Sequence, residues 1–360
     1  LVSMKFEKLL LAAALLGLVS LSPSCSDDDP AADPEKNETP GGGDKPEEPE
    51  GPDTPDTPEL TKGVKVEGYY KGDYHDEGTG NFWINFTIED KNDPEGYHIL
   101  CLDFNDSLAA DPDFPKLAEG DYPMNDGTNY PAGSLNGDGD TYVARHDEEG
   151  DFTYSEAQEG SAKIEVIDGL YKVTCTLTLE KDEPYTFEYY GPLAFYNRTL
   201  DGNMSNLTED VEPVFTQGMA IYYGDIYEMG SDAWNVLLAE VDYDLDINYG
   251  QGDAVQLAFN TTKGVSDYIP DGEYTLLDAN TAEELPAGTM LAGMYDATYG
   301  GYWGCWFYSV RRLAEARLDT GSVTVSRTGE IYTLKLKLKD GAGRQVTSTY
   351  TGKLTYYSGE

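Results

Sequence analysis

The chain has 360 residues, with 24 Lys and Arg against 67 Asp and Glu, and a formal net charge of −43. Long-range repulsion from this charge argues against nucleic acid and anionic membrane surfaces as partners. We expect the charge to keep an exported protein soluble, with cation binding as the alternative.

The first 24 residues read as a signal peptide. Lys5 and Lys8 precede an apolar run of about thirteen residues, which is too short to span a bilayer but suits a secretory signal. A small residue followed by Cys25, directly after that run, resembles the cleavage site of bacterial lipoproteins, in which the cysteine is diacylated. We therefore predict lipidation at Cys25. The alternative is an ordinary signal peptide followed by a chance cysteine.

The residues after Cys25 give an expected location and a tether. Ser26-Asp27-Asp28-Asp29 resembles the export signal of Bacteroidetes-type surface lipoproteins, which implies anchoring at the outer face of the outer membrane, with contact to the membrane only through the lipid. Residues 25–63 are dominated by Pro, Glu, Asp, Gly and Thr. Such a segment buries too little apolar surface to offset its ordering entropy, so we predict a disordered tether.

An internal repeat predicts two homologous domains. One pattern occurs at 160–180 and again at 321–340: Gly-Ser, a short strand, a turn, Tyr and a long alternating strand, with Tyr171 aligned to Tyr332. Earlier landmarks recur in the same order, with Trp83 aligned to Trp234. The predicted domains span 64–197 and 217–358. The linker 198–216 reads as polar and loop-like.

Within each copy the hydrophobic pattern has a period of two. Tyr332, Leu334, Leu336 and Leu338 alternate with polar residues, which is typical of a strand with one buried face. Many short, evenly spaced strands predict an all-β fold, an antiparallel β-sandwich or a calycin-like barrel. The only helical candidates are short, such as Val310 to Arg317.

The ending GSxxxxxxGxYxLxLxLxD…YxGxLxYY, behind the lipoprotein signal and acidic tether, resembles uncharacterised surface lipoproteins of gut Bacteroidetes-type bacteria. The resemblance covers the tether signature and the C-terminal half of each repeat. It implies a cell-surface β-domain and supplies no catalytic residues.

The remaining cysteines, Cys101, Cys175 and Cys305, lack the spacing of a metal cage or redox motif. Cys175 is in phase with apolar neighbours, so we expect a buried thiol. Export also permits a Cys101–Cys175 disulfide, which stays open.

Few residues suggest catalysis or metal binding, and we expect no cofactor. The three histidines have no zinc-binding spacing, and Asp319-Thr320-Gly321-Ser322 resembles an aspartic-protease turn that the repeat explains as an ordinary turn. The run containing Asn136, Asp138 and Asp140 has alternating oxygen donors, but it lacks the Gly and Glu of an EF-hand loop. A second acidic run, 242–248, lacks that Gly too. Solvated turns and strand faces are the simpler interpretation of both runs.

The most unusual segment is Tyr295 to Tyr308. Alternation places Tyr302, Trp306 and Tyr308 on one face, opposite a second apolar face, with Tyr299 nearby. Flat, partly exposed aromatic rings beside acids suit stacking on sugars. The alternative is burial against the other domain or a covering loop.

These observations favour a non-catalytic surface protein that binds a glycan through Tyr299, Tyr302, Trp306 and Tyr308. The alternatives are an adhesive or structural protein that binds a surface protein partner, and a hydrolase that uses dispersed carboxylates such as Glu188 or Glu283. Sandwich folds host all three functions.

Overall fold

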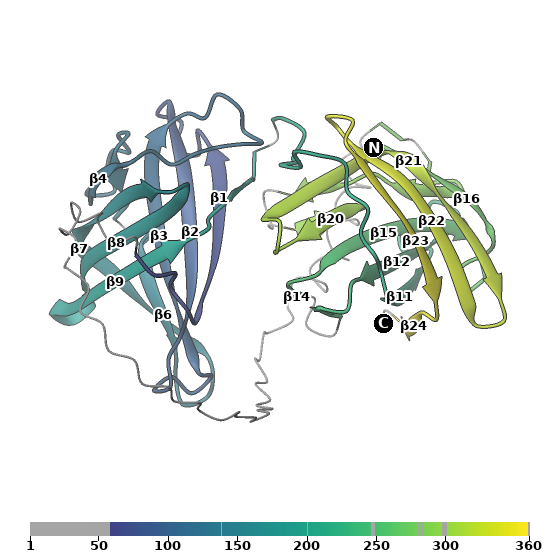
Figure 1. Ribbon diagram of the computed structural model, residues 1–360, viewed down its shortest axis with the longest axis horizontal. Helices are drawn as coiled ribbons and strands as arrows, with labels where there is room; N and C mark the ends of the chain where they lie inside the picture. The colour runs from purple at the N-terminus through teal and green to yellow at the C-terminus, as the bar shows by residue number, and fades with distance from the viewer. Residues whose placement is uncertain are drawn as a thin grey trace, which may run out of the picture.

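The computed structural model describes residues 58–358 except 138, 200, 246–248, 279–280, 283 and 297–300. The signal peptide, Cys25 and most of the tether lie outside these residues. Within them, no helix is long and apolar enough to cross a membrane. The described chain is all-β and forms two tandem domains side by side, the first in purple to teal and the second in green to yellow (Figure 1).

The first domain is a path of hydrogen-bonded strands separated by turns. Its strands are β1 (Val64–Gly72), β2 (Thr79–Glu89), β3 (Tyr97–Ser107), β4 (Gly120–Pro123), β5 (Ser134–Leu135), β6 (Tyr142–His146), β7 (Phe152–Ile167), β8 (Leu170–Leu179), β9 (Glu183–Gly191) and β10 (Phe195–Asn197). A single 3-10 turn, η1 (Glu180–Asp182), joins β8 to β9.

The strand order is β10-β1-β2-β3-β6-β7-β8-β9, with β5 on β3 and β4 on β7. Only β10 runs parallel to its neighbour. The first half of β7 pairs with β6, whereas its second half pairs with β4 and β8, so this long strand passes from one layer to the other. Since the described ends β10 and β9 do not pair with each other, the sheet is folded into a sandwich and is not a closed barrel.

The second domain repeats this plan. Its strands are β11 (Gln217–Gly224), β12 (Ser231–Ala239), β13 (Tyr243–Asp244), β14 (Tyr249–Gly250), β15 (Asp253–Thr262), β16 (Gly272–Leu277), β17 (Thr289–Leu291), β18 (Met294–Asp296), β19 (Gly301–Trp303), β20 (Trp306–Ser309), β21 (Ala314–Thr328), β22 (Ile331–Asp340), β23 (Gln345–Gly352) and β24 (Thr355–Ser358). The main path is β23-β22-β21-β16-β17-β15-β12-β11-β24, with β20 between β15 and β21. As in the first domain, the last strand, β24, runs parallel to the first, β11.

A β-bulge interrupts the long strand of each domain, at Gln158 in β7 and at Asp319 in β21, and a glycine follows it two residues later. Gly160 in β7 and Gly321 in β21 have φ of 149° and 115°, conformations that side chains disfavour. A Cβ at Gly160 would lie 2.4 Å from the carbonyl oxygen of Thr176, and one at Gly321 would lie 2.1 Å from that of Lys337. The Asp-Thr-Gly-Ser motif at 319–322 therefore belongs to this bulge inside a strand. It is neither an isolated turn nor a protease-like loop.

Matching hydrogen bonds recur in the two domains. Tyr189 donates its hydroxyl to the carbonyl of Pro192 at 2.7 Å, and Tyr350 donates in the same way to Lys353 at 2.5 Å. Other matched pairs are Tyr122 to Ala118 with Tyr274 to Pro270, and Ser134 to Pro131 with Thr289 to Pro286. The duplication thus extends to the side-chain contacts that fix the turns.

One predicted match is wrong by one residue. Trp83 pairs with Tyr69 across β1–β2, three residues before Gly72. Trp234 pairs with Tyr222 across β11–β12, two residues before the matching Gly224. The equivalent of Trp234 is therefore Phe82, and both point into a core. Trp83 points to the opposite face, which we call the outer face, away from the core of its own domain.

The alternation along β22 is confirmed. Leu334, Leu336 and Leu338 are buried, while Lys335 and Lys337 are exposed. The predicted short helix at Val310–Arg317 is wrong, because this segment forms a turn followed by the start of β21. Residues Ala314–Arg317 pair with β20, and Ala316 also bridges to Ser205; this pairing overrides the helical propensity of the segment.

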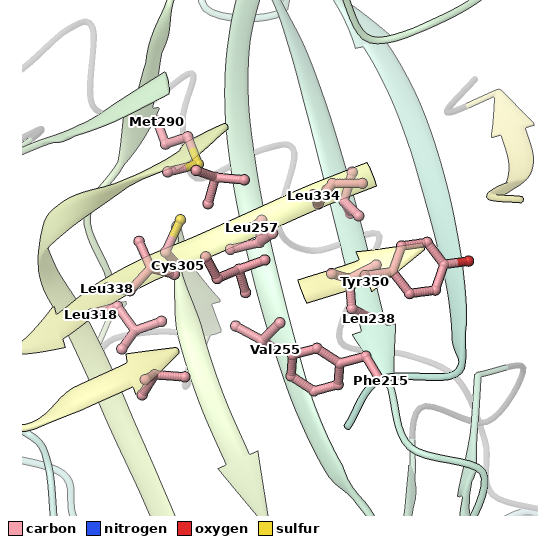
Figure 2. Packing of buried hydrophobic residues seen from close by; sticks show 14 of the residues in the cluster. Phe215, Leu238, Val255, Leu257, Met290, Cys305, Leu318, Leu334, Leu338 and Tyr350 are labelled. Carbon is pink, nitrogen blue, oxygen red and sulfur yellow. The ribbon is translucent and has the colours of Figure 1, made fainter. Parts of the chain in front are cut away.

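The linker is not simply polar and loop-like. Leu207, Val211 and Phe215 are buried in the core of the second domain, and Phe215 lies beside Leu238 and Val255 in Figure 2. Isolated bridges align the linker with β21 and β23. Residues 203–216 therefore belong physically to the second domain.

The three described cysteines are free and buried, which leaves no Cys101–Cys175 disulfide. Cys175 lies in the core of the first domain, as expected, whereas Cys101 lies on the outer face of β3. Burial raises the pKa of the Cys175 and Cys305 thiols to about 12.

Candidate functional site

The aromatic segment 295–308 forms a short hairpin folded back on a third strand. Strands β18 and β19 pair with each other, and β20 pairs separately with β15 and β21. The Tyr302 ring meets the Trp306 ring edge-on, with centroids 4.8 Å apart. Trp306 is 0 % exposed and donates its indole N–H to the carbonyl of Trp303 at 2.7 Å. The prediction that Trp306 is an exposed sugar platform is therefore wrong.

Tyr302 and Tyr308 are only partly exposed, and the neighbouring Tyr299 lies outside the described residues. Tyr302 donates its hydroxyl to Oε2 of Glu315 at 3.1 Å. Burial raises the pKa of both Tyr302 and Tyr308 well above the usual value, since a phenolate would lose its hydration there. These rings are constrained by contacts and do not present an open stacking surface.

The aromatic segment contacts the first domain through Arg198. The guanidinium pairs with Glu315 of β21, and both side chains are 7 % exposed. Four tyrosine rings surround the guanidinium carbon at centroid distances of 4.8 to 5.5 Å, two from the first domain and two from the second: Tyr69, Tyr196, Tyr295 and Tyr302. Burial against the other domain, the alternative interpretation of this segment, is what the structure shows.

The first calcium candidate is folded inward. Asn136 is 0 % exposed, and its amide nitrogen donates to Oδ1 of Asp103 at 2.9 Å. Its amide oxygen accepts hydrogen bonds from Asn105 and Asn125. Asp138 lies outside the described residues, and Asp140 is half-buried. The run is therefore not a solvated turn, and Asn136 serves a polar network on the outer face of β3.

That network contains buried oxygen atoms that have no hydrogen-bond partner among the described residues. Asn81, Asp103 and Asn105 are all 0 % exposed, and the partnerless atoms are Oδ1 of Asn81, Oδ2 of Asp103 and Oδ1 of Asn105. On the same face, Nε1 of Trp83 and Oδ1 of Asn85 are also without a partner. Buried polar atoms are nearly always paired, so this concentration marks the face as a candidate binding site.

Charged groups surround this network. Burial raises the pKa of the Asp103 carboxyl well above its usual range, and repulsion from Asp140 adds to the effect. Burial lowers the pKa of the Lys71 amine, whose ammonium lies over the ring of Trp83, against the attraction of Asp103. Perturbed groups of opposite sign in one place are typical of functional sites as well as of structural ion pairs.

The sequence did not single out Asp103, because Leu102-Asp103-Phe104-Asn105 matches Leu257-Ala258-Phe259-Asn260 as part of the repeat. Asp103 lies between Leu102 and Phe104 in a strand that is buried without interruption from Leu100 to Asp106. The feature of the sequence that could have identified this site is a carboxylate between two apolar residues of a buried strand, where it must point to the face opposite the core. The second domain lacks it, since the equivalents of Asn81 and Asp103 are Ala233 and Ala258.

The same position in the second domain is a small cavity of about 30 Å³, room for roughly one or two water molecules. Tyr223, Tyr227 and Trp303 contribute aromatic walls, and the buried amide oxygen of Asn235 has no partner. A whole sugar ring does not fit in this volume.

A much larger, open groove of about 760 Å³ lies at the β11–β24 edge of the second domain. Its lining combines apolar, amide, hydroxyl and carboxylate groups: Gln217, Met219, Val241, Asp242, Tyr243, Asp244, Leu245, Gly250, Gln251, Thr355 and Tyr357. Tyr357 is 46 % exposed and Val241 is 76 % exposed. The acidic run 242–248 was a cation candidate from the sequence, but its contact with β24 could not be predicted because the two segments are more than a hundred residues apart.

The remaining candidates do not gather into a catalytic site. No group of three His, Cys, Asp or Glu side chains that could hold a metal occurs among the described residues. His98 contacts Tyr185 and Asp90, whereas His146 pairs with Asp93 at 2.8 Å. Glu188 is an exposed residue of β9 and lies 3.6 Å from Lys172, and Glu283 lies outside the described residues.

Neither the family models, the curated proteins nor the solved structures that were searched contain a match to this chain.

Proposed function

We propose that this protein is a non-catalytic surface binding protein whose open groove at the β11–β24 edge binds a glycan. The observation that carries the proposal is the exposed ring of Tyr357 in a groove whose lining also contains Asp242, Asp244 and Gln251. This is the combination of flat ring and hydrogen-bonding groups that the sequence had led us to expect at Trp306.

The chemistry suits a sugar. The C–H face of a pyranose covers apolar ring area, as an aromatic side chain requires, and the gain is a few kcal/mol at most per ring. Carboxylates accept hydrogen bonds from hydroxyl groups, while the amide of Gln251 and the hydroxyl of Thr355 both donate and accept. Each polar group of a sugar could thus find a partner.

Size and charge narrow the ligand. A volume of about 760 Å³ lies within the roughly 300–1,000 Å³ of small-molecule sites, which corresponds to a short stretch of glycan. The net charge of −43 disfavours polyanionic chains. We therefore expect a neutral or amino-sugar glycan.

The test is a glycan array probed with the full chain, followed by titration of any ligand. Tyr357→Ala should weaken binding at least about tenfold, equivalent to roughly 1.4 kcal/mol, with little change in melting temperature. Tyr154→Ala is the matched control, since Tyr154 is 60 % exposed on the first domain. An equal loss in the control, or a ligand unaffected by Tyr357→Ala, would reject the groove. Release of shortened glycan would instead identify a hydrolase.

A protein partner is the second candidate, favoured by the edge position of β24. This strand ends the sheet path, and Tyr356 and Tyr357 on it are both more than 40 % exposed. A partner strand could pair with such an edge. A silent glycan array combined with binding to a surface protein, lost on Thr355→Pro, would favour this adhesive function.

We further propose display outside the cell through lipidated Cys25, as the lipoprotein-like signal implies. Cys25→Ala should release the protein or leave it unprocessed. The assignment fails if this variant stays membrane-bound and accessible to protease on intact cells.

A further inference from the structure

We infer that the first domain binds a divalent cation, Ca²⁺ by its chemistry, on the outer face of β2 and β3. The oxygens that would hold it come from Asn81, Asp103 and Asn105. All three side chains are completely buried, and each directs to this face an oxygen without a hydrogen-bond partner. This site is independent of the proposed glycan groove, which belongs to the other domain.

The three side chains are already tied to one another. Asn81 lies directly opposite Asn105 across the β2–β3 pair, so their Cβ atoms are separated by about 5 Å. Asn81 donates to Oδ1 of Asp103 at 2.5 Å. Asn136 bridges Asp103 and Asn105, donating to one and accepting from the other. These hydrogen bonds join the three side chains into one network, and we place the ion among their remaining oxygens.

The three unpaired oxygens would be satisfied by a positively charged ligand. The three atoms are acceptors, and one is a carboxylate oxygen, whose burial without a counter-charge is costly. Asp140 brings a second negative charge close by. Lys71, the nearby cation, has its ammonium over the ring of Trp83, and Oδ2 of Asp103 remains without a hydrogen bond. A cation at this cluster would compensate the carboxylates and satisfy the amide oxygens together.

Oxygen-only donors select the metal. Ca²⁺ accepts carboxylate and amide oxygens in flexible geometry with six to eight ligands, whereas Zn²⁺ prefers nitrogen and sulfur and Mg²⁺ retains its waters. Because Asp103 is the one carboxylate among the three donors and Asp140 adds only a second charge nearby, affinity in the roughly 10⁻⁴–10⁻³ M range of extracellular modules is expected. In the second domain, Ala233 and Ala258 replace Asn81 and Asp103. We therefore expect one such cation site per chain, in the first domain.

The test is thermal unfolding of the full chain in EDTA, then in rising CaCl₂, with MgCl₂ at equal ionic strength alongside. Ca²⁺ should raise the melting temperature more than Mg²⁺. Asp103→Asn, which keeps the acceptor Oδ1 position, and Asp140→Asn, at a half-buried site, should each weaken the response about tenfold, or roughly 1.4 kcal/mol. Asp121→Asn, an exposed acid of the first domain, should leave the response unchanged.

Terbium gives a second readout that does not depend on stability. Trp83 pairs with Asp103 across β2–β3, so excitation of tryptophan should sensitise bound Tb³⁺, and Trp83→Phe should remove that signal while leaving the Ca²⁺-dependent melting shift. The inference is overturned if Mg²⁺ and Ca²⁺ act equally, if Asp103→Asn responds like the unmodified chain, or if about 10 mM Ca²⁺ has no effect, an outcome that assigns ordered water to the cluster.

Discussion

Arg198 and Glu315 lie in different halves of the chain and form a buried, two-pronged ion pair between them. Nη1 donates to Oε1, and Nη2 donates to Oε2 at 3.1 Å. Burial by itself lowers the pKa of Arg198, but the attraction of Glu315, its hydrogen bonds and the neighbouring tyrosines together outweigh this cost and leave the pKa above its usual value. Because the surrounding tyrosines come from both domains, the pair lies at the contact between them.

Breaking this pair from one side should be severe. Arg198→Met leaves the Glu315 carboxylate buried without a counter-charge, which costs about 3–5 kcal/mol. Chemical denaturation of the single variants and of Arg198→Met with Glu315→Gln measures the coupling. The double variant should recover part of the loss. If the single losses simply add, the pair is not coupled and the contact does not hold the domains together.

Trp306 should be a stability residue. Truncation to Ala removes a fully buried indole and the hydrogen bond to Trp303, at a cost of about 3–5 kcal/mol. Urea unfolding checks this, and Tyr154→Ala serves as the exposed aromatic control. A Trp306→Ala chain of unchanged stability would mean that the indole is accessible after all.

Neighbouring positions on β22 should behave in opposite ways. Leu336→Ala should cost about 2–5 kcal/mol because Leu336 is 2 % exposed, whereas Lys337→Ala should change stability by less than about 0.5 kcal/mol. Differential scanning calorimetry of both variants gives the comparison. Similar losses at the two positions would contradict the assignment of faces.

The thiols should be protected in the native state. Cys101, Cys175 and Cys305 are free and buried, and burial raises their pKa values, so little thiolate is available to a labelling reagent. Ellman's reagent should label them only after denaturation, without prior reduction. Labelling of only one of the three in denaturant would indicate a disulfide.

His98 should contribute to acid sensitivity. Burial lowers the pKa of its imidazole below 6.5, although Asp90 opposes the shift from 3.2 Å. The unfolded chain then binds a proton that the folded chain resists, so this stability is complete above pH 6.5 and is lost as the pH falls through the folded pKa. Melting temperatures between pH 7.5 and 5 should fall less in His98→Asn. An NMR titration giving a pKa above 6.5 would refute the assignment.

Much of the fold could be predicted because its signals are local or repeated. The alternation through Leu334 and Leu336 identifies a half-buried strand without knowledge of its partners. The Gly-Ser repeat identifies the duplicated bulge, although not its conformation. The Trp83–Trp234 match is wrong because it rests on the two residues being the same amino acid. Side-chain direction alternates at every residue of a strand, so a shift of one residue places the side chain on the opposite face.

The candidate sites were harder because they depend on contacts between distant segments. Alternation placed Trp306 and Tyr308 on one face correctly, but it does not show that Tyr302 folds back over that face or that Arg198 approaches it. The groove likewise needs Asp242 beside Tyr357, and the polar cluster needs Asn136 beside Asp103. These pairings arise from tertiary packing, which overrides what any one segment suggests.

The buried linker decides where the chain can be divided. A fragment starting at Gln217 would omit Leu207, Val211 and Phe215 and would leave three holes in the core of the second half. A protease cut near Gly202 would leave these three core residues attached to the second domain, whereas a cut after Phe215 would remove them from it. The boundary of the second domain therefore lies before the start of the repeat at residue 217, and this domain includes the segment that packs into its core ahead of β11.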